Sequence, residues 1–122
     1  MKITLWGVRG SIPTFNPSTR VYGGNTSCIE VEEDGCMLVL DAGSGITNLN
    51  FSKNLDCPRI DILLTHLHID HIQGLSFFKP LFDPTKEVQI GGQHTNAHSL
   101  RNRLGRYFSP HLSPFYFREL TC

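Results

Sequence analysis

The sequence predicts an α/β fold, in which one mixed β-sheet carries helices on one of its faces. Short alternating or apolar runs, typical of strands, form a hairpin pair first and then alternate with segments of helical periodicity. The length of 122 residues, 39% of them hydrophobic, suits one small domain and not two independent cores. We therefore expect a single domain over residues 1–122, with no obvious cover for the second face of its sheet.

The first part of the chain is expected to supply three strands. Lys2–Val8 alternates in part and predicts a strand, and the segment Arg9–Gly24, rich in Gly, Pro, Ser and Thr, predicts a long loop. Thr26–Glu32 alternates again, with its aliphatic side chains on one face and its glutamates on the other. Asp34-Gly35 is a strong signal for a two-residue hairpin, so Cys36–Leu40 is predicted to be the returning strand.

The second part is expected to alternate helices and strands. After the break at Asp41–Gly45, a weak helix is predicted to end near Asn54. A strand buried on both faces is predicted over Ile60–Thr65, and a helix is predicted from Asp70 that stops before Pro80. A short strand is predicted over Glu87–Ile90, followed by a third helix over Ala97–Phe108 that is capped by Thr95 or Asn96. The apolar run Phe115–Phe117 comes last.

Composition and charge exclude several classes of protein. Basic and acidic residues number 11 each, so the formal net charge is zero. The chain also has no acidic or basic tail of the kind that would indicate binding to nucleic acid or to a membrane surface. Residues 1–70 carry 5 basic and 8 acidic residues and residues 71–122 carry 6 and 3, a contrast that indicates either an anionic ligand or a solvated helix face. No apolar run could cross a bilayer and no signal peptide is evident, so we expect a cytoplasmic protein. The cysteines form no CxxC pair and are expected to be thiols: Cys28, Cys36, Cys57 and Cys122.

Three histidines and a carboxylate follow the predicted strand that ends at Thr65. The i, i+2 spacing of His66 and His68 puts both imidazoles on one side of an extended backbone, where they could reach one metal ion. Asp70 and His71 follow as the chain turns into a helix, and they could hold a second ion. Neutral imidazole and carboxylate suit Zn²⁺, with Mn²⁺ and Fe as alternatives. The competing interpretation is a chance histidine cluster on a surface loop.

The segment THLHIDHIQGL resembles the HxHxDH motif of the metallo-β-lactamase superfamily. Three further segments agree with it: the strand and Gly-rich turn at 5–14, the segment at 23–31, and Leu40-Asp41-Ala42-Gly43, which has the form Asp-x-Gly. Together they are most similar to the phosphodiesterase and tRNase Z-like branch. The domain of that family is an αββα sandwich of two similar halves whose sheets pack face to face, and the resemblance implies that this chain is the first half.

The resemblance also implies a role for each residue of the motif. His66 and His68 would bind one divalent ion and Asp70 and His71 a second, while Asp41 would orient the histidines through hydrogen bonds. Asp70 would in addition act in catalysis by holding the proton of the nucleophile. The implied reaction is attack of a metal-activated water on a phosphodiester: a cyclic nucleotide, a nucleic acid or a small phosphodiester. A carboxylic ester or a β-lactam is the alternative substrate, and a turn or helix cap is the alternative role for Asp41.

The motif supplies fewer ligands than two catalytic ions need. A catalytic zinc takes three protein ligands, so two sites with one shared group need about five or six, and the motif has four. In the family the remaining ligands lie beyond residue 122. Local substitutes are His94, His98 and His111, for which a surface position is the simpler explanation. Arg101, Arg103 and Arg106 could steer a phosphate, or they could form a solvated helix face. Arg9 and Ser11 could border the site, or they could form a structural turn.

Two functional hypotheses result. In the first, the chain is the N-terminal portion of a metal-dependent hydrolase, expected to be a phosphodiesterase, or it completes its site by pairing with another chain. In the second, it is a catalytically inactive truncated remnant or an interaction module, which exposes a large apolar sheet face and associates with other chains. Binding of RNA without hydrolysis is a third alternative, and the zero net charge does not favour it.

Overall fold

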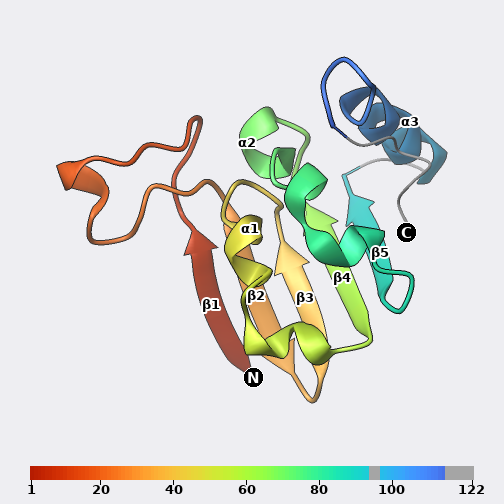
Figure 1. Ribbon diagram of the computed structural model, residues 1–122, viewed down its shortest axis with the longest axis horizontal. Coiled ribbons are helices and arrows are strands. Elements are labelled where there is room, and N and C mark those ends of the chain that lie inside the picture. Colours follow the sequence, from red (N-terminus) through yellow and green to blue (C-terminus); the bar gives the residue numbers. More distant parts are fainter. Residues whose placement is uncertain (94–96, 115–122) are drawn as a thin grey trace.

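Five strands form one sheet in the order in which they occur along the chain (Figure 1). The computed structural model describes residues 1–93 and 97–114, except for the side chains of residues 54, 97 and 98. The strands are β1 (Lys2–Gly7), β2 (Cys28–Glu33), β3 (Cys36–Leu40), β4 (Arg59–Leu64) and β5 (Glu87–Gly92). β1, β2 and β3 pair antiparallel, whereas β3, β4 and β5 pair parallel, so the predicted mixed α/β sheet is confirmed.

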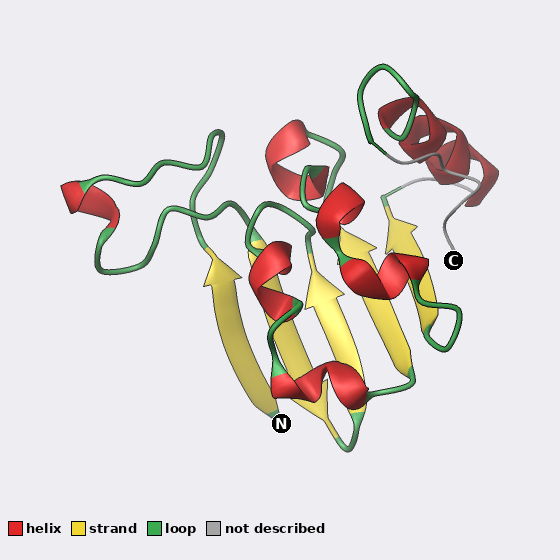
Figure 2. Cartoon of the chain, in the orientation of Figure 1, coloured by secondary structure: helices red, strands yellow, loops and turns green. Residues whose placement is uncertain are grey.

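Short helical segments cover one face of this sheet (Figure 2). They are α1 (Ile46–Leu49) and three 3₁₀ turns, at Lys53–Asp56, Leu75–Phe77 and Lys79–Phe82. α2 (Ile69–Ile72) follows β4, and α3 (Ala97–Tyr107) follows β5. The core lies between this layer and the sheet, and its fully buried members include Val39, Ile46, Leu49, Ile60, Ile62, Leu75, Phe78 and Leu81.

The prediction of one helix that starts near Asp70 and stops before Pro80 was wrong. The α-helix is a single turn, and two 3₁₀ turns follow it. The amide of Gly74 donates to the carbonyl of Ala42 at 2.9 Å, so it makes no helical bond to the residue four positions earlier. A tertiary hydrogen bond therefore ends this helix.

The other helix predictions had different outcomes. The helix expected to reach Asn54 is shorter, because α1 ends at Leu49 and a separate 3₁₀ turn begins at Lys53. α3 is confirmed and begins at Ala97. Its predicted cap, Thr95 or Asn96, and the run Phe115–Phe117 lie outside the described residues.

Among residues 1–93 and 97–114, no helix covers the second face of the sheet, and this face carries exposed apolar side chains. β4 was expected to be buried on both faces, but Leu63 is 47% exposed. The strand register aligns Leu5, Ile29, Leu40 and Leu63 in a row across four strands of this face. Glu30, on the opposite face, is buried and accepts a hydrogen bond from Trp6 Nε1 at 2.8 Å. The aliphatic side of β2 therefore faces outward, and its glutamate side lies under the helices.

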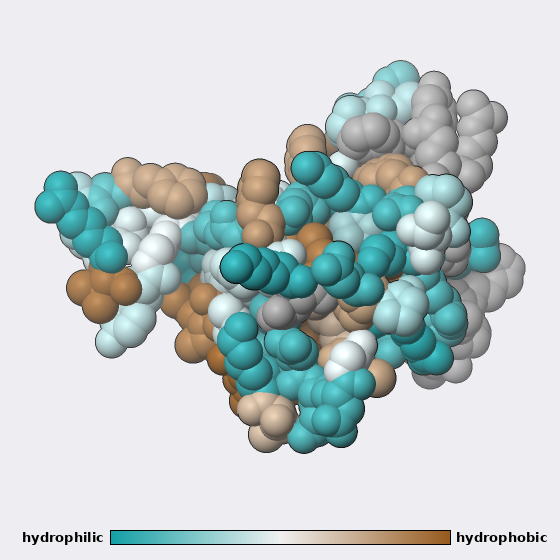
Figure 3. Space-filling model, turned by 60° about the horizontal axis from the view of Figure 1, so that its bottom comes forward, coloured by the Kyte–Doolittle hydropathy of each residue, from teal (hydrophilic) through white to brown (hydrophobic). Residues whose placement is uncertain are grey.

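Exposed apolar side chains also lie on the first strand and on the loop that follows it. In Figure 3, brown surface lies on the loop at the left of the view and on the body of the molecule beside it. Ile3 and Leu5 of β1 are 58% and 62% exposed. In the described ranges, no helix is both long enough and apolar enough to cross a membrane.

Candidate metal centre

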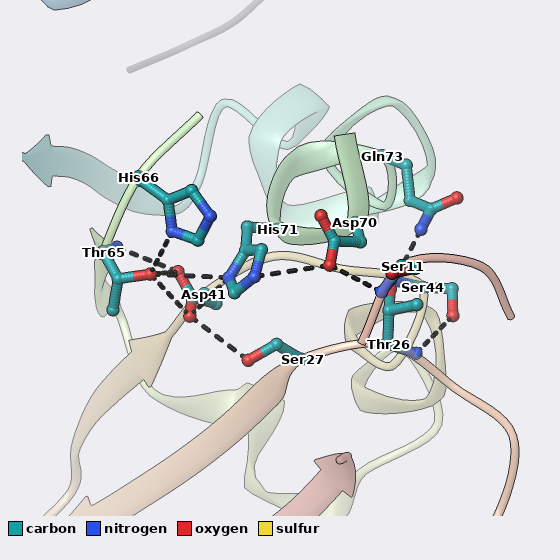
Figure 4. A network of polar contacts seen from close by, with 10 residues as sticks. All are labelled: Ser11, Thr26, Ser27, Asp41, Ser44, Thr65, His66, Asp70, His71 and Gln73. Carbon is teal, nitrogen blue, oxygen red and sulfur yellow. Dashed lines mark hydrogen bonds and ion pairs between the residues drawn. The ribbon is translucent and has the colours of Figure 1, made fainter. Parts of the chain in front are cut away.

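The predicted metal-binding residues meet where β3 and β4 end. Asp41 follows β3, and Thr65 follows β4. Because these two strands are parallel neighbours, their carboxyl ends lie at the same edge of the sheet. The imidazole ring of His66 lies with its centroid 4.4 Å from that of His68 and 4.0 Å from that of His71. Figure 4 shows His66 and His71 beside the carboxylate of Asp41 and the hydroxyl of Thr65, with Asp70 on the far side of His71.

The backbone conformation accounts for how the histidines are presented. His68 is still extended, with φ −66° and ψ 151°, and it precedes the first residue of α2. Asp70 and His71 lie inside that helical turn. The backbone changes from extended to helical after His68, and the ring of His71 still comes within 4.0 Å of the ring of His66.

Asp41 is the buried centre of a hydrogen-bond network. The residue is 4% exposed, and its carboxylate accepts from the Thr65 amide at 2.9 Å and from Ser27 Oγ at 3.2 Å. His71 Nδ1 lies 2.8 Å from Asp41 Oδ2. Asp41 itself has φ +61°, a left-handed conformation that Asp tolerates better than most residues. The carboxylate predicted to orient histidines thus contacts one of them, His71, directly.

Asp70 is held by a loop that is distant in the sequence. Its Oδ2 accepts from the backbone amide of Ser11 at 2.8 Å and lies 3.5 Å from His71 Nε2. This hydrogen bond lowers the pKa of the Asp70 carboxyl below its usual value, because an N–H donor stabilises the charged form. Ser11, at φ +70°, is one of three non-glycine residues with positive φ in the described ranges. Ser11 therefore borders the site through its amide, which was one of the two interpretations considered.

Two glycines let α2 approach the turn after β3. A Cβ on Gly43 would lie 2.3 Å from the Asp70 carbonyl oxygen, and a Cβ on Gly74 would lie 2.2 Å from the Gly43 carbonyl oxygen. The Ala42 amide donates to the His71 carbonyl at 2.8 Å across this contact. The backbone that carries Asp70 and His71 is therefore fixed against the backbone that carries Asp41.

A buried hydroxyl joins the same turn to the end of α2. Thr26 is fully buried, and its Oγ1 accepts from the Ser44 amide at 2.8 Å and from Gln73 Nε2 at 3.0 Å. The Thr26 amide donates in return to Ser44 Oγ at 2.9 Å. These bonds connect the start of β2, the turn after β3 and the end of α2, and they hold the surroundings of the histidines in place.

The donor atoms suit a divalent metal in kind but are not gathered around one point. Imidazole nitrogen and carboxylate oxygen are ligands of Zn²⁺, Mn²⁺ and Fe. Among residues 1–93 and 97–114, however, no group of three or more His, Cys, Asp or Glu side chains is placed to hold an ion. The ring of His66 lies close to those of both His68 and His71, with centroids 4.4 and 4.0 Å away, and Asp70 Oδ2 lies 3.5 Å from His71 Nε2. The assignment of His66 and His68 to one ion and of Asp70 and His71 to a second stays a prediction.

The other residues considered do not join this cluster. His111 is exposed after α3, His94 lies outside the described residues, and His98 is in α3 with no described side chain. Arg101, Arg103 and Arg106 are exposed on α3, as expected for a solvated face. Arg103 and Arg106 also line an open pocket of about 370 Å³ together with Leu67 and Ile69, the residues that alternate with the motif histidines.

Sequence reasoning missed the hydroxyl groups of Thr65, Ser27 and Thr26. All three contact the turn after β3 or the residues around it. For Thr65 a signal was present, because it is the last residue of the predicted strand and directly precedes the first histidine. Ser27 and Thr26 had none, since their contacts depend on the pairing of β2 with β3.

The comparison with known proteins decides the family. The family model of the metallo-beta-lactamase superfamily matches residues 21–119. The chain belongs to this superfamily. The match includes the turn after β3 and the whole histidine motif, so the predicted resemblance is confirmed.

Individual members of the metallo-beta-lactamase superfamily are similar over different lengths. The anti-Pycsar protein Apyc1 of Paenibacillus harenae is 39% identical over 49 residues, which are 39% of this chain and 20% of that protein. Ribonuclease Z of Haloarcula marismortui is 29% identical over 97 residues, which are 80% of this chain and 29% of that protein. A crystal structure of a diphosphatase from the PhnP family superposes with a TM-score of 0.60 at 21% identity, over 87% of this chain and 46% of the other.

These comparisons confirm the fold and its extent. The structural likeness shows the metallo-β-lactamase fold. The chain spans about half the length of the solved diphosphatase and less than a third of either curated relative. The observed sheet with helices on one face is therefore the partial form of this fold that the sequence predicted.

Proposed function

We propose that this chain carries the histidine motif of a metal-dependent hydrolase that cleaves phosphodiesters with a metal-activated water. The observation that supports the proposal most strongly is the clustering of three motif side chains at the ends of β3 and β4. His71 lies against both Asp41 and Asp70, and the ring of His66 lies 4.0 Å from that of His71. The membership of the metallo-beta-lactamase superfamily supports it as well. A relative named ribonuclease Z, 29% identical over most of this chain, favours a phosphodiester as the substrate class.

In this proposal the two donor pairs hold two divalent ions. His66 and His68 would bind one, and Asp70 and His71 would bind the other, with Zn²⁺ the preferred metal and Mn²⁺ or Fe the alternatives. Such ions, when bound, lower the pKa of a coordinated water and take up negative charge on phosphoryl oxygens. The Ser11 amide donates a hydrogen bond to Asp70 Oδ2 and so fixes the orientation of this carboxylate.

Hydrolysis of bis-p-nitrophenyl phosphate in the presence of Zn²⁺ or Mn²⁺ tests the proposal. The wild-type chain is compared with His66→Ala and His71→Ala, and His111→Ala is the matched control because His111 is exposed outside the cluster. The proposal expects turnover by the wild type and by the control, and only background turnover by the two motif variants. Equal turnover by all four proteins would show that the motif is not responsible.

A second candidate is a non-catalytic interaction module of the same fold. It is favoured by two observations: the open apolar face of the sheet, and the absence of a three-donor group within the described residues. In this case the chain would bind zinc through the motif, or not at all, and would hydrolyse no phosphodiester. Its partner would cover the apolar face, and a second copy of the chain is one such partner.

A further inference from the structure

The hydroxyl of Thr65 lies between Asp41 and the histidines. Thr65 Oγ1 is 2.9 Å from Asp41 Oδ1 and 3.0 Å from Asp41 Oδ2. The same oxygen is 3.0 Å from His66 Nδ1 and 3.4 Å from His71 Nδ1. The amide of Thr65 also donates to Asp41 Oδ1, which holds the residue in place from its backbone (Figure 4).

Counting donors fixes where the hydrogens lie. A hydroxyl has one hydrogen to donate and two lone pairs, whereas an ionised carboxylate can only accept. The Thr65 hydrogen therefore goes to Asp41, and only lone pairs of Thr65 Oγ1 remain for His66. To form the 3.0 Å contact, His66 must carry its hydrogen on Nδ1. The lone pair of its neutral ring is then on Nε2, on the opposite side from the Asp41 network.

The same reasoning applies to His71 without an intermediary. Its Nδ1 lies 2.8 Å from Asp41 Oδ2, so the hydrogen is on Nδ1 and the lone pair is on Nε2. Nε2 is the atom that faces Asp70, at 3.5 Å from Oδ2. Both rings thus present Nε2 as an acceptor, and both hydrogen positions depend on one buried carboxylate.

We propose that Thr65 is a positioning residue, whose hydroxyl extends the control of Asp41 from His71 to His66. Since the proposed function assigns these two histidines to different ions, a single carboxylate then prepares both halves of the metal centre; this consequence rests on the proposed function. The hydrogen positions themselves do not rest on it, because they follow from contacts within the metal-free chain.

Ser27 provides a matched control. Its hydroxyl donates to the same carboxylate oxygen of Asp41 that contacts His71, at 3.2 Å. Its hydroxyl bonds to Asp41 and not to a histidine, so Ser27→Ala removes one donor from Asp41 and leaves the link from Thr65 to His66. Thr65→Val removes the linking hydroxyl and keeps the β-branched shape, while Thr65→Ser keeps the hydroxyl.

The direct experiment is two-bond ¹H–¹⁵N correlation NMR of the histidine rings in the metal-free protein at about pH 8.5, where an ordinary histidine ring is neutral. In the wild type, His66 and His71 are expected in the Nδ1–H form. Thr65→Val is expected to move His66 toward the Nε2–H form that free histidine favours and to leave His71 unchanged. Thr65→Ser and Ser27→Ala are expected to resemble the wild type.

Zinc affinity, measured by competition with a chromophoric chelator, gives the second readout. Thr65→Val is expected to weaken zinc binding by about 10- to 100-fold, as is usual when a hydrogen-bond partner of a ligand is lost, and Thr65→Ser to restore it. An Nε2–H ring at His66 in the wild type, or no change of His66 in Thr65→Val, would overturn the proposal. If Thr65→Val does not fold, the wild-type spectrum still decides. If the wild type shows the expected Nδ1–H forms in the NMR spectrum but binds no zinc, the positioning role of Thr65 is supported and the proposed function is contradicted.

Discussion

Asp41 accepts hydrogen bonds from residues on three segments of the chain. Ser27 belongs to the segment before β2, Thr65 to the end of β4 and His71 to α2. A buried carboxylate that accepts several hydrogen bonds holds the donor groups in fixed orientations. The orientation of the motif therefore depends on a residue that lies more than twenty positions before it.

Replacing Asp41 by Asn tests this dependence. The amide group brings two hydrogens into a site whose neighbours are donors, so at least one contact with Thr65 or His71 is lost. We expect zinc affinity to fall by about 10- to 100-fold. The control is Asp61→Asn, because Asp61 pairs with Arg59 at the surface, away from the motif. Zinc titration of both variants gives the comparison, and equal affinities would contradict the role of Asp41.

The cysteines differ in their expected reactivity. Burial raises the pKa of the Cys28 thiol to about 12, whereas Cys36 is exposed. The thiolate is the reactive form, so at pH 8.5 we expect iodoacetamide to label Cys36 in the native protein and to leave Cys28 unlabelled. Cys28 is expected to react only after unfolding or as the pH approaches 12. Peptide mass spectrometry measures both sites, and labelling of native Cys28 at the rate of Cys36 would refute its burial.

At the scale of elements, α2 shows what the sequence could and could not predict. The HxHxDH pattern predicted an extended segment followed by a helix, and the structure has both, with the change after His68. The length of the helix was not predictable from periodicity, because it ends where Gly74 bonds to Ala42 in another part of the chain. The hydrophobic alternation of β2 gave its two faces correctly but not which one is covered.

Gly74→Ala tests the packing of α2 against the turn after β3. The new Cβ would meet the Gly43 carbonyl oxygen at 2.2 Å and Ile46 Cγ2 at 2.4 Å, so backbone must move. We expect a loss of about 1–3 kcal/mol in the free energy of unfolding, as is usual for overpacking. Urea denaturation followed by circular dichroism measures it.

The matched control for this change is Gly105→Ala in α3. Nothing lies within 4 Å of a Cβ at that position, and alanine favours a helix over glycine by about 1 kcal/mol. The control is therefore expected to be as stable as the wild type or slightly more stable. A Gly74 variant with the stability of the control would mean that the close contact between Gly74 and Gly43 does not exist.

At the scale of the whole molecule, the uncovered sheet face is the dominant feature. The row formed by Leu5, Ile29, Leu40 and Leu63 crosses the sheet on the face without helices. Contiguous exposed apolar surface of this kind mediates association. The sequence offered no obvious cover for this face, but it did not show how far the apolar row extends, which depends on the strand register.

The double substitution Leu5→Thr and Leu63→Thr tests this feature. Threonine keeps the preference for strands and lowers the apolar area. We expect the wild type to self-associate at micromolar concentration and to bind a hydrophobic dye, and the double variant to do both less. Val21→Thr is the control, because Val21 is exposed on the loop and away from the sheet. Sedimentation velocity and dye fluorescence are the measurements; a monomeric wild type without dye binding would contradict the expectation.

Metal binding by the motif is the claim on which the account depends, and zinc content tests it most directly. The wild-type chain and the double variant His66→Ala/His71→Ala are dialysed against the same buffered zinc, and bound metal is measured by mass spectrometry. The account predicts about one to two Zn²⁺ per wild-type chain and none above background in the double variant. Equal zinc content in the two proteins, or none in the wild type, would contradict it.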